Sequence, residues 1–354
     1  MKILIVNNEA QDHSDRIIHW EGNQIGFTRV GFEDILKNLW KPGSEPTVDR
    51  NAIDELVSDS LEADVVYCES PEALLLWYVL TRRGLRKVPI VMEDEDMLFT
   101  VSVVSGWIKK KYGENVLKEF LGDGSNVWLH HAKSQRKEYT GRGVPPERLV
   151  HMPCSSYYLS LLSEAAFEKV RDKSFSPELQ EKYGYLRGGV VAAGVNQRDY
   201  ATFVDAIEGI GIDAWVVSAS CSPEVEASEN VGWIEFVPID EYVEILNLAS
   251  VVVVPMFDRD HSGGENTTTF AMALGKPVIA TETPGTREII TGGVNGVLVP
   301  PEDTSSLRSA IEKLINDEVL RGSIGKEAMA AEELISTAGR DALLKAFGMV
   351  EKTG

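Results

Sequence analysis

The chain has 354 residues, of which 43% are hydrophobic and 25% are charged, a composition typical of a globular protein long enough for two domains. Its 35 basic and 55 acidic residues give a net charge of −20, which argues against nucleic acid as a partner and weakens attachment to anionic lipid. No apolar run approaches the ~20 residues of a membrane span, and the start MKILIVNNEA is typical of a strand rather than a signal peptide. We therefore expect the protein in the cytoplasm.

Strand-like segments recur along the first half of the chain and predict an α/β domain. The expected strands are residues 2–6, 63–67, 89–92, 126–129 and 149–152. Helical stretches separate several of them, and this alternation favours a parallel sheet with right-handed crossovers. The loop after the first strand is irregular, because polar sequence follows Asn7 as far as Trp20. His130, His131 and His151 lie at or near strand ends, where we expect structural roles.

Two charged segments of the first half each allow two interpretations. The acidic run EDED at residues 93–96 follows an expected strand, so Asp94 could accept a proton or bind a cationic group, or the run is an exposed loop without a specific role. Residues 105–120 (SGWIKKKYGENVLKEF) carry four lysines beside aromatic and aliphatic side chains. This segment either contacts a membrane or exposes its lysines and packs its apolar side on the domain, and we favour the second.

The second half repeats the alternation of strands and helices and predicts another α/β domain. Its expected strands are residues 189–193, 214–218, 232–236, 251–254, 278–280 and 296–299. The linker is expected between residues 155 and 187, where the regular alternation of strands and helices is interrupted and Ser176-Pro177 breaks a helical pattern. Cys68, Cys154 and Cys221 are widely spaced, which predicts buried thiols rather than a metal site or a disulfide framework.

The stretch from residue 249 to residue 303 contains the clearest signal of a binding site. Residues 251–254 are an uninterrupted β-branched run, which predicts a parallel strand buried on both faces. A glycine-rich turn follows, and residues 265–274 can form the next helix. The N–H groups at the helix start and the helix dipole favour a phosphate at residues 263–268. Turns after strand ends are where open α/β sheets bind ligands, although ordinary βα turns would look the same.

Three short sequence segments in this region resemble those of a known family. They are ALGKPVIAT at residues 273–281, GTREII at 285–290 and NGVLVP at 295–300. They resemble the carboxyl-terminal domain of retaining glycosyltransferases of the GT-B fold, family 4-like (glycosyl transferases group 1), of which the chain would be a divergent member. The resemblance implies an α/β protein with two Rossmann-like domains whose parallel sheets face a central cleft. It also implies domain bounds: an acceptor domain over residues 1–163, a nucleotide-sugar donor domain over 164–336, and a helix over 337–354 that packs back on the first domain.

The resemblance further implies which residues hold the donor diphosphate. Arg198, in the loop GVNQRDY of residues 194–200, stands where relatives hold a basic residue against the phosphates, although a surface ion pair would also explain it. A second basic residue of the relatives is replaced by Val195. Further donor contacts are expected from Asn196, Ser262, Gly263, Gly264, Glu265, Asn266, Thr267 and Thr268. The candidate catalytic residues are Asp94, Arg198 and His261, and His261 either touches the donor or only orders its loop.

The chain departs most from the family at the ribose. Relatives hold the ribose hydroxyls with the second of two glutamates, and the two glutamate positions are Ser262 and Phe270 here. Glu265 cannot simply replace the lost carboxylate, because positions 265 and 270 differ by ~140° around a helix axis. It either touches the donor from the turn or stabilises the helix start through the dipole.

Two functions from different classes follow from the resemblance and from these departures. The leading hypothesis is a metal-independent, retaining hexosyltransferase that moves a hexose from a nucleotide-diphosphate sugar to an unknown acceptor, without a further cofactor. Its front-side attack would be assisted by the departing phosphate. The alternative is a catalytically inactive GT-B-like partner or regulatory protein, which the missing glutamates favour, and a sugar-nucleotide epimerase is a less favoured third. The acceptor can be a glycan, a lipid, a small molecule or a protein, and a protein partner is possible.

Overall fold

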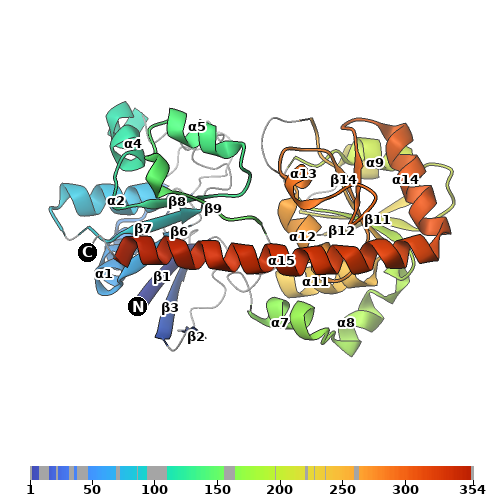
Figure 1. The fold of residues 1–354 in the computed structure, drawn as a ribbon, viewed down its shortest axis with the longest axis horizontal. Coiled ribbons are helices and arrows are strands. Elements are labelled where there is room, and N and C mark those ends of the chain that lie inside the picture. Colours follow the sequence, from blue (N-terminus) through green and yellow to red (C-terminus); the bar gives the residue numbers. More distant parts are fainter. Residues whose placement is uncertain are drawn as a thin grey trace. The chain divides into compact units, whose positions relative to one another are not determined.

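The computed structural model divides into two compact units (Figure 1). The amino-terminal unit is Met1–Met152 with Asp341–Gly354, and the carboxyl-terminal unit is Pro153–Arg340. The sequence placed the corresponding bounds after residue 163 and before residue 337. The structure describes the chain except for residues 1, 8–15, 21–22, 32–35, 38–46, 69–71, 86, 94–109, 155–163, 196, 220–221, 227, 236, 259–262 and 352–354.

A seven-stranded sheet forms the centre of the amino-terminal unit, in the order β2-β3-β1-β6-β7-β8-β9. Its strands are β1 (Lys2–Asn7), β2 (Arg16–Trp20), β3 (Asn23–Gly31), β6 (Val65–Cys68), β7 (Ile90–Glu93), β8 (Val127–His130) and β9 (Leu149–His151). The five predicted strands are confirmed, and neighbours are parallel except that β2 runs antiparallel to β3. The pair β2–β3 was not predicted, because polar residues interrupt its apolar ones. A separate ribbon joins β4 (Leu36–Lys37) to β5 (Thr47–Val48).

Helices cover this sheet and complete its apolar core. They are α1 (Arg50–Glu62), α2 (Glu72–Arg82), α4 (Glu114–Leu121) and α5 (Gln135–Gly141), followed by the 3-10 turn η1 (Pro146–Arg148). Phe120 of α4 is fully buried, with its ring against those of Trp77 and Trp128. Lys118 of the same helix is exposed. The described part of the lysine-rich segment therefore packs its apolar side on the unit, as favoured above, while residues 105–109 lie outside the described residues.

The carboxyl-terminal unit is built on a six-stranded parallel sheet in the order β12-β11-β10-β13-β14-β15. Its strands are β10 (Val190–Ala193), β11 (Ala214–Ser218), β12 (Val231–Glu235), β13 (Val251–Val254), β14 (Val278–Thr281) and β15 (Val297–Val299). All six were predicted and are confirmed. The four valines of β13 are fully buried, as expected for a central strand covered on both faces.

The helices of this unit follow the predicted alternation with strands. They are α7 (Glu164–Asp172), α8 (Pro177–Lys182), α9 (Tyr200–Ile207), α10 (Pro223–Glu226), α11 (Ile239–Leu248), α12 (Glu265–Ala273), α13 (Thr286–Ile289) and α14 (Thr304–Asn316), with a 3-10 turn η3 (Gly184–Leu186). Ser176 caps α8 and Pro177 occupies its first position, so the helix begins where the sequence predicted a break.

The chain closes with a 34-residue helix, α15 (Glu318–Glu351), drawn in red in Figure 1. Its end groups with the amino-terminal unit from Asp341 onward. There the Phe347 ring lies edge-on to Tyr67, with 6.3 Å between ring centroids, and Arg148 donates to the Met349 carbonyl over 3.3 Å. The sequence predicted this part of the helix but not its continuous run from residue 318.

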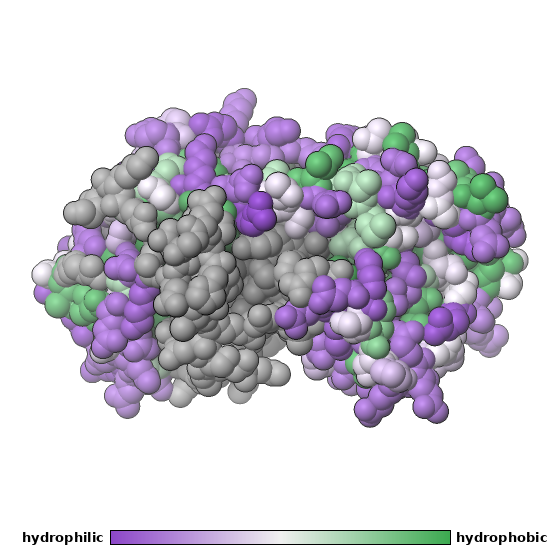
Figure 2. Space-filling view, turned by 60° about the horizontal axis from the view of Figure 1, so that its bottom comes forward, coloured by the Kyte–Doolittle hydropathy of each residue, from purple (hydrophilic) through white to green (hydrophobic). Residues whose placement is uncertain are grey.

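The described surface mixes polar and apolar side chains. On the face in Figure 2, apolar residues occur singly or in small groups among hydrophilic ones, wherever the residues are described. Isolated exposed apolar side chains such as Val319 and Leu334 are normal for a folded protein. A search of the described helices finds none that is both long enough and apolar enough to cross a membrane.

Candidate functional site

The carboxyl-terminal sheet changes direction between β10 and β13. From β10 the chain adds β11 and β12 on one side and then returns to β13 on the other. The loops that follow β10 and β13 therefore leave adjacent strand ends in opposite directions. This β10/β13 edge, the carboxyl ends of the two strands, is the position at which open α/β sheets bind ligands.

Arg198 lies at the β10/β13 edge, in the loop after β10. Its Nε donates to the Ala193 carbonyl over 2.9 Å, and its Nη2 donates to Thr267 Oγ1 over 3.4 Å. The guanidinium lies against Gly194, where a Cβ would come within 2.3 Å of Nη2. Gly194 also has a φ of +122°, which L side chains rarely adopt. The loop thus requires glycine there for its backbone and for the close approach of the guanidinium.

The first turn of α12 lies beside Arg198. Thr267, whose hydroxyl accepts from the Arg198 guanidinium, belongs to this turn. Gly264, just before the helix, has a φ of +88°, and a Cβ there would come within 2.8 Å of Val254 Cγ1. The first N–H groups of a helix have no partner within the helix, and the dipole adds partial positive charge to them. A guanidinium and a helix N-terminus thus meet at one edge, a combination suited to binding phosphate oxygens.

Two tyrosines brace these groups. The Tyr200 hydroxyl, from α9, donates to the Gly194 carbonyl, and the Tyr242 hydroxyl, from α11, lies 2.9 Å from Thr267 Oγ1. Burial raises the pKa of both tyrosines above the ordinary value, so both keep their protons at neutral pH. Neither tyrosine is predicted as a site residue from the sequence, because a tyrosine on the apolar face of a helix is indistinguishable from an ordinary core residue.

Glu265 is the first residue of α12 and is buried, with 7% of its surface exposed. Its Oε1 accepts from the Gly263 N–H over 2.9 Å. The carboxylate packs on Gly285, where a Cβ would come within 1.5 Å of Oε1. Of the two roles predicted for Glu265, these contacts fit the stabilisation of the turn and of the helix start.

The hydroxyls of Thr268 and Thr269, which follow Thr267 in α12, hydrogen-bond to backbone carbonyls four residues earlier. Thr268 Oγ1 donates to the Gly264 carbonyl over 2.8 Å, and Thr269 Oγ1 donates to the Glu265 carbonyl over 3.0 Å. Both side chains are fully buried. The Thr268 hydroxyl therefore stabilises the turn through the Gly264 carbonyl. Asn266 in the same turn is half-buried.

Four predicted site residues, Asp94, Asn196, His261 and Ser262, lie outside the described residues. Phe270, at the position where relatives carry the ribose-binding glutamate, is only 2% exposed and belongs to the interior. Cys68 and Cys154 are buried, and Cys221 lies outside the described residues. Within the described part of the chain, no group of three or more His, Cys, Asp or Glu side chains could hold a metal ion.

The amino-terminal unit carries an acid–imidazole pair at its β7/β8 edge, the carboxyl ends of those two strands. Glu93 ends β7 and is fully buried, and its Oε1 lies 2.7 Å from Nε2 of His131, which follows β8. His131 Nδ1 lies 2.8 Å from the Met152 carbonyl, and it must donate there because a carbonyl oxygen only accepts. The sequence predicted structural roles for the histidines but did not identify Glu93 as a partner.

Comparison with known proteins finds a family likeness within the carboxyl-terminal unit. The family model described as "Glycosyl transferases group 1" matches residues 190–317. An uncharacterized glycosyltransferase of Methanocaldococcus jannaschii is 31% identical over 149 residues, which are 40% of this chain and 42% of that protein. A D-inositol 3-phosphate glycosyltransferase of Corynebacterium jeikeium is 31% identical over 118 residues, 33% of this chain and 27% of that protein. The matches therefore span less than half the length of these two relatives.

Solved structures resemble the chain over nearly its whole length. The Anabaena protein HepE in complex with UDP-glucose superposes with a TM-score of 0.66 at 15% identity, covering 98% of this chain and 100% of that one. A UDP-forming α,α-trehalose-phosphate synthase from Burkholderia xenovorans gives a TM-score of 0.61 at 12% identity, with 99% of each chain covered. At these identities the likeness concerns the fold alone.

Proposed function

We propose a glycosyl-transfer function for this chain, which has the GT-B fold predicted from its sequence and belongs, through residues 190–317, to the glycosyl transferases group 1 family. The proposed reaction moves a hexose from a nucleotide-diphosphate sugar to an acceptor, with retention and without a metal. The observation that supports it best is the meeting of Arg198 with the first turn of α12 at the β10/β13 edge.

The chemistry of the donor explains why this observation matters. The diphosphate already carries two negative charges and gains a third as the glycosidic bond breaks, and cationic and N–H donors fixed in advance lower the barrier to that step. Arg198 and the N–H groups of α12 would supply both kinds of donor. Retention would follow from attack on the same face as the departing phosphate, which would take the acceptor proton.

Arg198→Ala tests the donor site directly. A hydrogen bond to a charged group contributes about 1.5–3 kcal/mol, so the Kd for UDP-glucose, the ligand of the Anabaena structure, should rise roughly 100-fold in calorimetry. Arg198→Lys should recover part of the loss, because it keeps the charge but not the planar fork. A panel with GDP- and ADP-sugars would identify the base. Unchanged affinity in Arg198→Ala would reject this donor site.

A second candidate function rests on Phe270. Because this buried ring stands where relatives carry a ribose-binding carboxylate, the chain could bind a nucleotide without turning it over, as a partner or regulatory protein. Hydrolysis and transfer assays with a chelator present and absent separate the two candidates. Turnover unaffected by the chelator supports the metal-independent transferase, whereas tight binding without turnover against glycan, lipid and small-molecule acceptors supports the second.

A further inference from the structure

A short hydrogen-bonded chain joins helix α11 to Arg198. Tyr242 of α11 lies with its hydroxyl 2.9 Å from Thr267 Oγ1, and Thr267 Oγ1 accepts from Arg198 Nη2 over 3.4 Å. Tyr242 and Thr267 are 7% and 5% exposed, so solvent competes little for these contacts. A guanidinium only donates, which fixes Thr267 as the acceptor in its contact with Arg198.

Thr267 differs from the two threonines that follow it in the same helix. Thr268 and Thr269 turn their hydroxyls back onto carbonyls four residues earlier, as threonines in helices commonly do. The described bonds of Thr267 Oγ1 run instead to Tyr242 and Arg198. The residue four before Thr267 is Gly263, which lies outside the helix, and Tyr242 is placed to hold the Thr267 hydroxyl instead.

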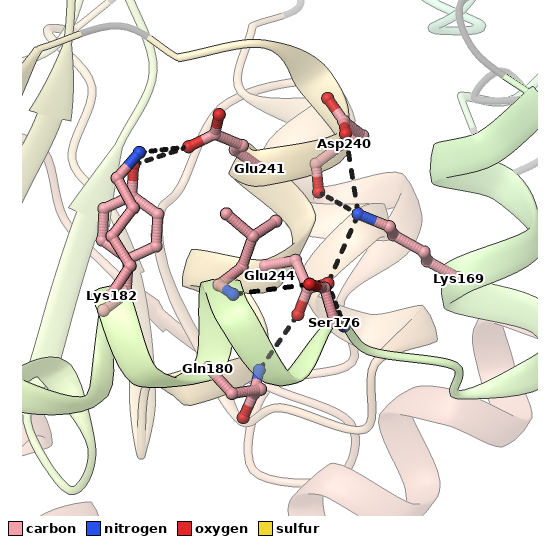
Figure 3. A network of polar contacts seen from close by, with 9 residues as sticks. Lys169, Ser176, Gln180, Lys182, Asp240, Glu241 and Glu244 are labelled. Carbon is pink, nitrogen blue, oxygen red and sulfur yellow. Dashed lines mark hydrogen bonds and ion pairs between the residues drawn. The ribbon is translucent and has the colours of Figure 1, made fainter.

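Helix α11 is itself held firmly on its other side. Residues 242 and 244 differ by ~200° around the helix axis, so Glu244 faces away from Thr267. Figure 3 shows this carboxylate surrounded by donors from α7 and α8. The Ser176 N–H lies 2.7 Å from Oε1, Gln180 Nε2 lies 3.0 Å from Oε2, and Lys169 Nζ lies 3.3 Å from Oε1.

These contacts satisfy a carboxylate that is fully buried. Removing one of them would leave the buried charge less well compensated, which is costly. The network therefore fixes α11 against α7 and α8, and Tyr242 approaches Thr267 from a rigid element. Rigid support of this kind is what a precisely placed binding group needs.

We propose that Tyr242 is a positioning residue of the donor site, which holds the Thr267 hydroxyl turned toward Arg198 and thereby orients the guanidinium for the diphosphate. The inference rests on the proposed function for its ligand, but its first step concerns the ligand-free protein. Without the Tyr242 hydroxyl, the Thr267 hydroxyl is expected to leave the orientation that faces Arg198. Arg198 Nη2 would then lose this acceptor.

The first measurement needs no ligand. Three-bond couplings in protein with labelled threonine methyl groups report the χ1 rotamer of Thr267. Tyr242→Phe keeps the ring and removes only the hydroxyl, and it should shift the χ1 rotamer of Thr267 away from the one in the unchanged protein. Tyr183→Phe is the matched control, because that hydroxyl donates to Glu241 on the same helix over 2.7 Å. The control should leave the Thr267 couplings as they are in the unchanged protein.

The second measurement is the Kd for UDP. Tyr242→Phe should raise it about fivefold, within the range for loss of one neutral hydrogen bond, and Thr267→Val should do the same. Thr267→Ser should retain the original affinity, since it keeps the hydroxyl. In an Arg198→Ala background Tyr242→Phe should have no further effect, because its action passes through Arg198.

The outcomes separate the inference from the proposed function. A Thr267 rotamer that is unchanged in Tyr242→Phe overturns the inference, whatever binds. An equal loss of affinity with and without Arg198 also overturns it, because Tyr242 would then act by another route. If the unchanged protein binds no nucleotide or nucleotide sugar of the UDP, GDP and ADP panel, the proposed function fails, and the role of Tyr242 toward the diphosphate fails with it.

Discussion

The β10/β13 edge and the β7/β8 edge both lie at the carboxyl ends of two neighbouring parallel strands, yet they carry different chemistry. At the first, Arg198 and the first turn of α12 bring N–H donors together. At the second, the Glu93 carboxylate lies 2.7 Å from the His131 imidazole, and His131 also bonds to a backbone carbonyl. The side chains at the strand ends, rather than the parallel strand pairing that both edges share, therefore distinguish an anion site from an internal brace.

The glycines beside the β10/β13 edge also differ from glycines of the amino-terminal unit. At the carboxyl edge of the second sheet, Gly194, Gly264 and Gly285 each lie so close to a side chain that a Cβ would meet it within 3 Å. In the amino-terminal unit, Gly84 and Gly124 have nothing within 4 Å of an added Cβ. Glycine permits close packing around the proposed donor site, whereas these amino-terminal glycines serve turns.

The largest expected effect would come from breaking the amino-terminal brace. Glu93→Ala removes one partner of a buried pair, which costs about 3–5 kcal/mol. Hydrogen exchange of the β7 and β8 amides should show a loss of that size in the free energy of opening. The UDP affinity of the protein that remains folded should not change.

The matched control for Glu93→Ala is Glu138→Ala, which breaks an exposed pair with Arg142 in the same unit. Its expected cost is about 0.5 kcal/mol or less. Similar losses in the two variants would mean that the buried pair is not a brace. A fall in UDP affinity in Glu93→Ala would mean that the two edges do not have separate tasks.

A smaller effect, measured as a change in binding, is expected from Gly194→Ala, in which the positive φ of residue 194 also adds backbone strain. The new Cβ would lie within 2.5 Å of three guanidinium atoms of Arg198, and a flexible side chain yields more readily than backbone. The guanidinium should move away from Thr267, and the Kd for UDP measured by calorimetry should rise about thirtyfold, or about 2 kcal/mol. Gly292→Ala, where an added Cβ meets nothing within 4 Å, should bind as the unchanged protein does.

The smallest effect is a dependence of amino-terminal stability on pH. Burial lowers the pKa of His130 from 6.5 to about 4. Because the unfolded chain then binds the proton more readily than the folded one, stability is full above pH 6.5 and falls as the pH drops toward 4.

His130→Asn keeps a donor for the Ala132 carbonyl but removes this titration. Between about pH 7.5 and about pH 5.5, the original protein should lose about 1 kcal/mol more than the variant in the opening of β8, measured by hydrogen exchange. Parallel losses in the two proteins would assign the acid sensitivity to other groups. The β10/β13 edge should show no such difference.

The sequence predicted much of this architecture because the relevant signals are local. Buried parallel strands appear as short β-branched runs, and all eleven expected strands are present. The sequence also predicted the break at Ser176-Pro177 and the glycine turn before α12, since helix capping and positive φ depend on neighbouring residues. The strand pair β2–β3 was missed because its pairing, rather than an apolar run, defines it.

The contacts that shape the site could not be predicted from the sequence, because each of them joins residues that are distant along the chain. Arg198 and Thr267 were named separately as phosphate contacts, but their meeting depends on β10 and β13 being neighbours in the sheet. Tyr242 and Glu93 gave no signal of their own. One lies on an ordinary amphipathic helix, and the other begins an acidic run.

The sequence by itself determined that this is a two-unit α/β protein with a phosphate-suited turn and a family resemblance strongest in its second half. Only the tertiary structure decided that Glu265 braces the turn, that Tyr242 reaches Thr267, and that Glu93 pairs with His131. The physical reason is that periodicity and turn propensity act between neighbours along the chain. Hydrogen bonds and close packing act between whichever groups the sheet order brings together.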